Sequence, residues 1–133
     1  MEKARHRKAE RLVAVQRQLK RAAETRHADA VREGVRLDGE TADLLAALDD
    51  GHFAPLMLEN VARRLERVAL ARQQALAAEA TAADQVKAES FTLKRAERHA
   101  EATGRLARAE DERAATDAIA EASLISSGRA SLA

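Results

Sequence analysis

Apolar and small residues recur every three or four positions through the first third of the chain. This spacing places them on one face of an α-helix, because about 3.6 residues complete a turn. We therefore predict a first helix over approximately residues 2–49. The positions assigned to its buried seam are Leu12, Val15, Leu19, Ala22, Arg26, Ala30, Gly34, Leu37, Thr41, Leu44 and Leu48.

The predicted seam is weakest in the middle of this helix. Two successive four-residue steps, from Arg26 to Ala30 and on to Gly34, are typical of a stutter, which locally unwinds a supercoil. Gly34 and Gly39 each weaken a helix by up to about 1 kcal/mol relative to alanine. The sequence therefore allows a kink over residues 34–39.

A turn is indicated over residues 50–54. Gly51 can adopt the left-handed conformation after a helix end, and Pro55 suits the first turn of a helix, where its missing N–H would be unbonded. Steps of four and three then predict a second helix over 55–123, followed by a frayed, serine-rich tail over 124–133. The second seam consists of Val61, Leu65, Val68, Arg72, Ala75, Glu79, Ala82, Val86, Glu89, Leu93, Ala96, Ala100 and Ala107.

The two helices are expected to lie antiparallel, since a reversal near Gly51 brings large residues of the two seams together. The expected pairs are Leu12 with Leu93, Leu19 with Val86, and Leu37 with Val68. We therefore predict one all-α domain in which two long helices form an antiparallel coiled-coil hairpin, with the C-terminal helix the longer. The residues after Ala102 then extend beyond the N-terminus, and their alanine-rich face needs either a protein partner or a second copy.

Composition supports this fold and excludes several others. Of 133 residues, 34% are charged and 2% aromatic, which is too little bulk for a broad core or a sheet architecture. Without cysteine the chain has neither a disulfide framework nor a thiolate zinc site. Because it has no apolar run of about 18 residues and no apolar signal core, we expect a soluble, unprocessed, cytoplasmic protein without a membrane span.

Charge changes sign along the chain. Residues 1–36 hold 11 basic and 5 acidic side chains, a net +6, whereas residues 37–60 hold 6 acidic and no basic ones, a net −6. The basic stretch is consistent with a solvated helix end, a surface for an acidic protein, or a contact with nucleic acid or lipid. The lack of Trp and Tyr and the interleaved Glu2 and Glu10 argue against nucleic acid. Residues 1–11 also lack the bulky apolar face of a membrane-surface helix.

Catalytic and metal-binding motifs are missing from the sequence. Glu24-x-x-His27 has the spacing of a di-iron ligand pair, but such a site needs two of these motifs and further carboxylates. His6 and His99 could face each other, yet two imidazoles without a carboxylate partner make a poor ligand set. Two helices also cannot enclose an apolar pocket. We therefore predict a non-enzyme without metal or cofactor.

Three stretches of the second helix and one of the first carry a family resemblance. They read RLVAVQRQL at 11–19, NVARRL at 60–65, KRAER at 94–98 and EDERAATD at 110–117. With a short acidic turn between two long helices, this pattern resembles the FliJ/YscO family of type III export systems. The likeness covers most of the chain and is one of pattern, because the family has no catalytic signature.

The resemblance implies a stalk similar in fold to the coiled coil of the rotary ATPase gamma subunit. Its terminal end would enter the hexameric export ATPase, and other parts would contact the export gate protein and secretion chaperones. A cytoplasmic location, peripheral at the membrane export apparatus, is implied, with flagellar and virulence systems undecided. An unrelated coiled-coil adaptor or oligomeric scaffold, such as a homodimer, is the alternative, and a basic helical nucleic-acid-binding protein is a third reading.

Two sets of residues are candidates for partner contacts. We expect a basic collar at the terminal end to bind the export ATPase, and apolar residues near the turn to bind the export gate or another partner. The collar consists of Arg5, Arg7, Lys8, Arg11, Arg105 and Arg108. The turn-proximal set consists of Leu44, Leu45, Leu48, Phe53, Leu56 and Met57.

Overall fold

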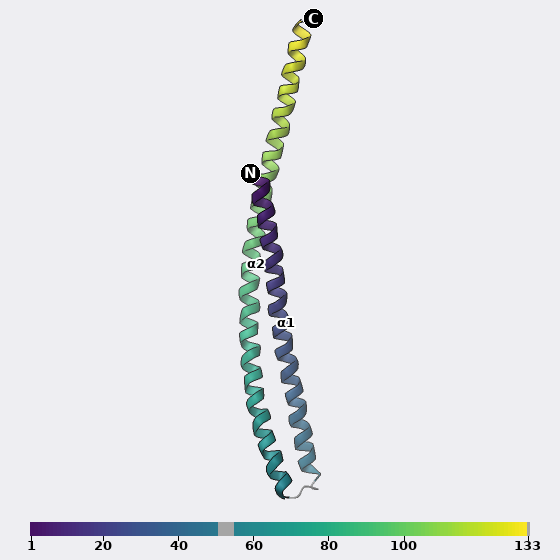
Figure 1. Ribbon diagram of the computed structural model, residues 1–133, viewed down its shortest axis with the longest axis vertical. Helices are drawn as coiled ribbons and strands as arrows, with labels where there is room; N and C mark the ends of the chain where they lie inside the picture. Colours follow the sequence, from purple (N-terminus) through teal and green to yellow (C-terminus); the bar gives the residue numbers. More distant parts are fainter. Residues whose placement is uncertain (51–54, 133) are drawn as a thin grey trace. The chain divides into compact units, whose positions relative to one another are not determined.

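The computed structural model describes residues 1–50 and 55–132, and within these ranges every residue except Met1 and Asp50 is helical. Helix α1 spans Glu2–Asp49 and helix α2 spans Pro55–Leu132 (Figure 1). With 78 residues against 48, α2 is the longer. The protein is an all-α, two-helix antiparallel hairpin, as the sequence predicts.

The helix boundaries agree with the predictions at three of four ends. Helix α1 ends at Asp49 and α2 begins at Pro55, where the sequence places them. The C-terminal end differs, because α2 includes residues 124–132, which were expected to fray. Helix α1 is also unbroken through residues 34–39. The predicted turn lies mostly outside the described residues.

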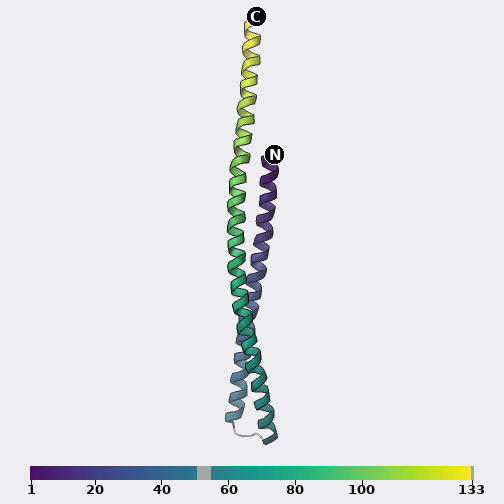
Figure 2. The ribbon, with the colours of Figure 1, turned by 90° about the vertical axis from the view of Figure 1, so that its left-hand side faces the viewer.

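Contacts divide the chain into two units, each of which contains a part of both helices. Unit 1 consists of residues 1–17 and 92–133, and unit 2 consists of residues 18–91. The two helices contact each other in each unit, side by side for unit 2 in Figure 1 and for the N-terminal part of unit 1 in Figure 2. Each unit is described separately below.

Unit 2 is held together by a small apolar core and by polar contacts between the helices. Leu37, Val68 and Ala75 are buried, with Leu44 packed against them, which confirms the predicted pairing of Leu37 with Val68. Burying a leucine or valine side chain contributes roughly 1.5–3 kcal/mol. Cross-helix ion pairs flank this core: Arg72 to Asp38 at 2.9 Å and Arg64 to Glu40 at 3.3 Å.

Gly34 has a packing role in unit 2. A Cβ atom at this position would collide with the guanidinium of Arg72, which reaches across α1 to Asp38. The glycine leaves room for this group, so its low helix propensity is offset by a cross-helix ion pair.

Unit 1 has a core of smaller side chains. Val13, Leu93 and Ala96 are buried together, and Ala100 packs against them. Ala9 and Ala107 are buried as well. Because alanine adds little bulk, the two helices of this unit can approach each other closely.

The observed seam of α2 matches the prediction, whereas that of α1 matches only from Ala30 onward. Every predicted seam residue of α2 is buried or half-buried. In α1, the predicted Leu12, Val15, Leu19, Ala22 and Arg26 are instead exposed. The stripe of buried and half-buried positions, beside which Ala28, Glu40 and Ala47 are also half-buried, is Glu2, His6, Ala9, Val13, Gln16, Lys20, Ala23, His27, Ala30, Gly34, Leu37, Thr41, Leu44 and Leu48.

This observed stripe alternates steps of four and three without interruption, so the predicted stutter at residues 26–34 is wrong. The expected pairs of Leu12 with Leu93 and of Leu19 with Val86 are wrong for the same reason, since Leu12 and Leu19 of α1 do not lie in the seam. The seam of α2 keeps strict heptads, and a stutter in α1 alone would bring knobs of one helix out of phase with holes of the other.

Candidate protein-binding surfaces

His6 fastens the start of α1 to α2 in unit 1. Its Nδ1 lies 3.0 Å from the carbonyl oxygen of Ala100, and its Nε2 lies 2.9 Å from a carboxylate oxygen of Glu10. Thr103, a buried polar residue, donates to the same Ala100 carbonyl at 3.0 Å. A Cβ atom at position 104 would lie 3.0 Å from the His6 ring, so Gly104 makes room for the imidazole.

The histidines do not form the facing pair that the sequence allows. His6 lies in the seam, whereas His99 lines a surface groove of unit 1. Among the described residues, no group of three or more His, Asp or Glu side chains is placed to hold a metal ion.

Polar contacts at the N-terminus mark where α1 stops covering α2. The backbone N–H of Glu2 donates to Glu110 at 3.0 Å, and Lys3 pairs with Asp111 at 3.1 Å. Beyond these contacts every residue from 112 to 130 is exposed. We call residues 112–130 the overhang.

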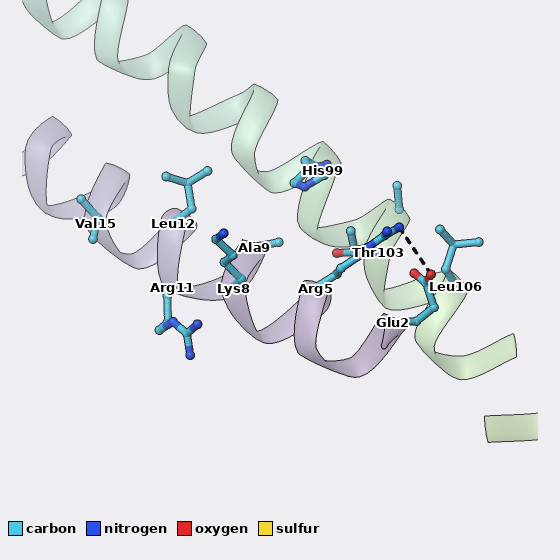
Figure 3. Close-up of a pocket in the computed structure, with 11 residues that line it drawn as sticks. Glu2, Arg5, Lys8, Ala9, Arg11, Leu12, Val15, His99, Thr103 and Leu106 are labelled. Carbon is cyan, nitrogen blue, oxygen red and sulfur yellow. Dashed lines mark ion pairs between the residues drawn. The ribbon is translucent and has the colours of Figure 1, made fainter. Parts of the chain in front are cut away.

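Unit 1 carries an open groove of about 700 Å³ along one side of the helix pair (Figure 3). We call it the unit 1 groove. Leu12 and Val15 of α1 and Leu106 of α2 line it with apolar surface, and each is about half exposed. The complete lining is Glu2, Arg5, Lys8, Ala9, Arg11, Leu12, Val15, His99, Ala102, Thr103 and Leu106.

The six predicted collar residues are all exposed in unit 1, and three of them belong to the groove. Arg5, Lys8 and Arg11 line it, and in Figure 3 the side chain of Arg11 extends away from α2. Arg7, Arg105 and Arg108 lie outside its lining.

The collar residues differ in whether an acidic side chain already neutralises them. Arg5 pairs with Glu2 at 3.5 Å, drawn as a dashed line in Figure 3, and Arg105 pairs with Glu101 at 3.8 Å. The other four form no ion pair with any part of the chain that the structure describes. These four are Arg7, Lys8, Arg11 and Arg108.

The turn-proximal set splits between packing and exposure in unit 2. Leu44 and Leu48 are half-buried, and Leu44 packs against the core around Leu37. Leu45, Leu56 and Met57 are exposed, Leu56 by 76%. Phe53 lies outside the described residues.

Sequence reasoning missed the groove because it placed Leu12 and Val15 inside the seam. The signal that could have found it is the strict heptad spacing behind Leu37. Counting back from Leu37 in alternating steps of three and four reaches Val13 rather than Leu12, and thereby leaves Leu12 on the surface.

The two side chains with shifted pKa values, Glu33 and Arg36, lie outside both candidate surfaces. Glu33 accepts two hydrogen bonds from the Arg36 guanidinium, at 2.7 and 3.0 Å, which lower the pKa of the Glu33 carboxyl. The same hydrogen bonds raise the pKa of Arg36. This exposed pair lies within α1 and supports the helix locally.

Comparison of the chain with protein-family models, with curated proteins and with solved structures found no match. None of the helices in the described ranges combines the length and apolar character that crossing a membrane requires. Any assignment of function therefore rests on the surfaces described above and on the resemblance seen in the sequence.

Proposed function

We propose that this protein is a non-enzymatic coiled-coil stalk of a type III protein export apparatus. Unit 1 binds the hexameric export ATPase, and unit 2 presents apolar side chains near the turn to the export gate protein or a secretion chaperone. The protein works by holding partners in place, and its location is cytoplasmic, next to the export apparatus.

The observation that carries this proposal is the concentration of unneutralised positive charge on unit 1. Arg7, Lys8 and Arg11 are exposed on α1 without an ion pair among the described residues, and Arg108 is exposed likewise on α2. A cluster of this kind draws an acidic protein surface and orients its approach. The resemblance to the FliJ/YscO family supplies the identity of that surface, the lining of an ATPase ring.

The exposed leucines near the turn support a second contact. Leu45, near the end of α1, is 50% exposed, and Met57, next to Leu56 at the start of α2, is 53% exposed. Exposed apolar clusters with a polar surround are typical of protein-binding sites. Replacing Leu56 with serine should weaken gate or chaperone binding without changing helicity, because Leu56 contributes little to packing.

The test uses the full chain and the purified export ATPase of the same organism. Changing Arg7, Lys8 and Arg11 to glutamate should abolish co-elution with the ATPase and stimulation of ATP hydrolysis. Each exposed ion pair contributes only about 0.2–1 kcal/mol, so the three changes are made together. Circular dichroism should remain unchanged, since none of the three residues is buried.

A matched control reverses three exposed bases of unit 2 that also lack ion pairs among the described residues. These are Arg21, Arg67 and Lys87. If both triple variants bind the ATPase equally well at low salt, the collar is not the binding surface. If the unaltered protein neither binds nor stimulates the ATPase, the assignment to an export stalk fails.

A further inference from the structure

Unit 1 leaves two surfaces uncovered, the unit 1 groove and the overhang. Leu12 is 47% exposed and Leu106 is 54% exposed in the groove, while Ile119 is 71% exposed in the overhang. Large apolar side chains concentrated in this way on one small unit favour association. The groove and the overhang are chemically complementary, which indicates that each covers the other.

The overhang has an apolar stripe with acidic borders. Ala115, Ala118, Ile119, Ala122 and Ile125 share one helix face by their spacing of three and four. Glu112 and Glu121 border this face on its two sides. The overhang holds three acidic side chains and two basic ones, Arg113 and Arg129, a net −1, and its acids flank the apolar stripe.

The groove is complementary to this stripe in chemistry and in length. Its lining combines apolar Leu12, Val15 and Leu106 with Lys8 and Arg11, neither of which has an ion pair among the described residues. At about 1.5 Å per residue, the overhang extends roughly 27 Å and the groove-lining part of α1 roughly 20 Å. The overhang is therefore long enough to cover the whole groove.

The overhang cannot fill the groove of its own chain. It continues the helix that forms one wall of that groove, and α2 is unbroken from Pro55 to Leu132. A helix without a break carries residues 112–130 away from residues 99–106. An overhang in the groove must therefore come from another molecule.

We propose that the overhang of one copy lies in the unit 1 groove of a second copy, and that the second copy returns the same contact. Two such contacts related by a two-fold axis form a closed, antiparallel dimer. In each contact the overhang becomes a third helix beside the two helices of the partner's unit 1. This dimer forms without any ATPase, but its contact uses Lys8 and Arg11 of the collar, so dimer formation and the proposed ATPase contact exclude each other at this surface.

A pair of charge-reversed variants of the full chain tests the proposal. The groove variant carries Lys8→Glu and Arg11→Glu, and the overhang variant carries Glu112→Lys and Glu121→Lys. Each variant alone places like charges in both contacts, so its apparent dimer dissociation constant should rise roughly tenfold or more. Mixed together, they place opposite charges in both contacts, and the dimer should return.

Sedimentation equilibrium and light scattering at low and high salt measure the mass in each case. A dimer that is weakened by either reversal, weakened by salt and restored by mixing supports the proposal. The control variant Glu66→Lys with Asp84→Lys reverses two exposed acids of unit 2 and should leave the dimer unchanged. Restoration on mixing also shows that both reversed variants remain folded.

Two results would overturn the proposal. One is a monomeric unaltered chain at all accessible concentrations in low salt. The other is a dimer that neither reversal affects, which would place the interface elsewhere.

The absence of cysteine allows the contact to be located directly. A flexible bis-maleimide should link copies carrying Leu106→Cys to copies carrying Ile125→Cys, since one residue lies in the groove and the other on the overhang stripe. Leu70→Cys, 56% exposed in unit 2, is the matched control. Equal linking of Ile125→Cys to both positions would also exclude the proposed interface.

Discussion

Units 1 and 2 contain parts of the same two helices with the same heptad spacing, but they differ in where their large side chains lie. In unit 2, Leu37 and Val68 occupy the seam and form a core. In the α1 part of unit 1 the seam consists mostly of small and polar residues such as Ala9 and His6, while Leu12 is exposed. Unit 2 therefore uses its leucine for internal stability, and unit 1 keeps apolar side chains available for a partner.

The two units also differ in how the seam handles polar groups. In unit 2, Arg72 extends out of the seam over Gly34 and pairs with Asp38. In unit 1, the His6 side chain stays at the helix contact, where its Nδ1 faces the carbonyl oxygen of Ala100 and its Nε2 faces the carboxylate of Glu10. Both seams contain polar residues, but the α1 part of unit 1 buries no leucine, so unit 1 should be the less stable of the two.

The largest effect is expected for Leu37→Ala in unit 2. Leu37 is 3% exposed, and removing a buried leucine side chain typically lowers the free energy of unfolding by about 2–5 kcal/mol. Urea denaturation followed by circular dichroism measures the change. Leu45→Ala, at a half-exposed position of the same helix, should have a much smaller effect. Equal losses would contradict the assignment of the unit 2 core.

In unit 1, Val13→Ala should destabilise more than Leu12→Ala, although leucine is the larger residue. Val13 is 7% exposed and its loss should cost about 1.5–3 kcal/mol, whereas Leu12 lies on the surface. The comparison is made by thermal unfolding at a fixed low concentration, to separate it from association. A larger loss of stability in Leu12→Ala than in Val13→Ala would instead support the seam predicted from the sequence.

Gln16→Leu should stabilise unit 1. The side-chain oxygen of Gln16 is buried and has no hydrogen-bond partner among the described residues. Replacing an unsatisfied polar group with an apolar side chain should raise the free energy of unfolding by about 1 kcal/mol. Gln18→Leu, at an exposed neighbouring position, should change it little. A loss of stability in Gln16→Leu would indicate that the oxygen has a partner in solution.

Substituting two glycines by alanine compares a position on the open helix surface, Gly39, with one at the contact between the helices, Gly104. Gly39→Ala in unit 2 should stabilise by about 0.5–1 kcal/mol, because nothing lies within 4 Å of the added Cβ. Gly104→Ala in unit 1 should gain less or lose stability, since the new atom meets the His6 ring. The midpoint of thermal unfolding should therefore rise more for Gly39→Ala. Equal increases would show that His6 moves aside at no cost.

The smallest effect concerns Glu33 and Arg36. Hydrogen bonds from Arg36 lower the pKa of Glu33 in the folded chain, so this pair contributes stability above the ordinary glutamate pKa. That contribution is lost as the pH falls through the lowered value. An NMR titration of the Glu33 carboxyl should show the lowered pKa, and Arg36→Ala should return it toward its ordinary range. An unchanged titration in Arg36→Ala would assign the shift to another cause.

The sequence by itself determined the helical class, the end of α1 at Asp49, the start of α2 at Pro55 and the seam of α2 except for the buried Thr103. These features depend on local physics, namely helix propensity, proline geometry and apolar spacing. The α2 stripe was identified correctly even through Glu79 and Glu89, because Val86 and Leu93 stand between and beyond them at heptad distance.

Only the tertiary structure decided which stripe of α1 faces α2. Leu12 and Val13 both belong to stripes with three- and four-residue steps, although only the stripe through Val13 reaches Leu37 in strict alternation. Side-chain size favoured Leu12, but the strict heptads of α2 require the stripe that joins Leu37 in phase. The helices bury alanines such as Ala9 and Ala96 between them, and the larger Leu12 lies outside. The groove is a consequence of that choice, and it is visible only once two helices are placed together.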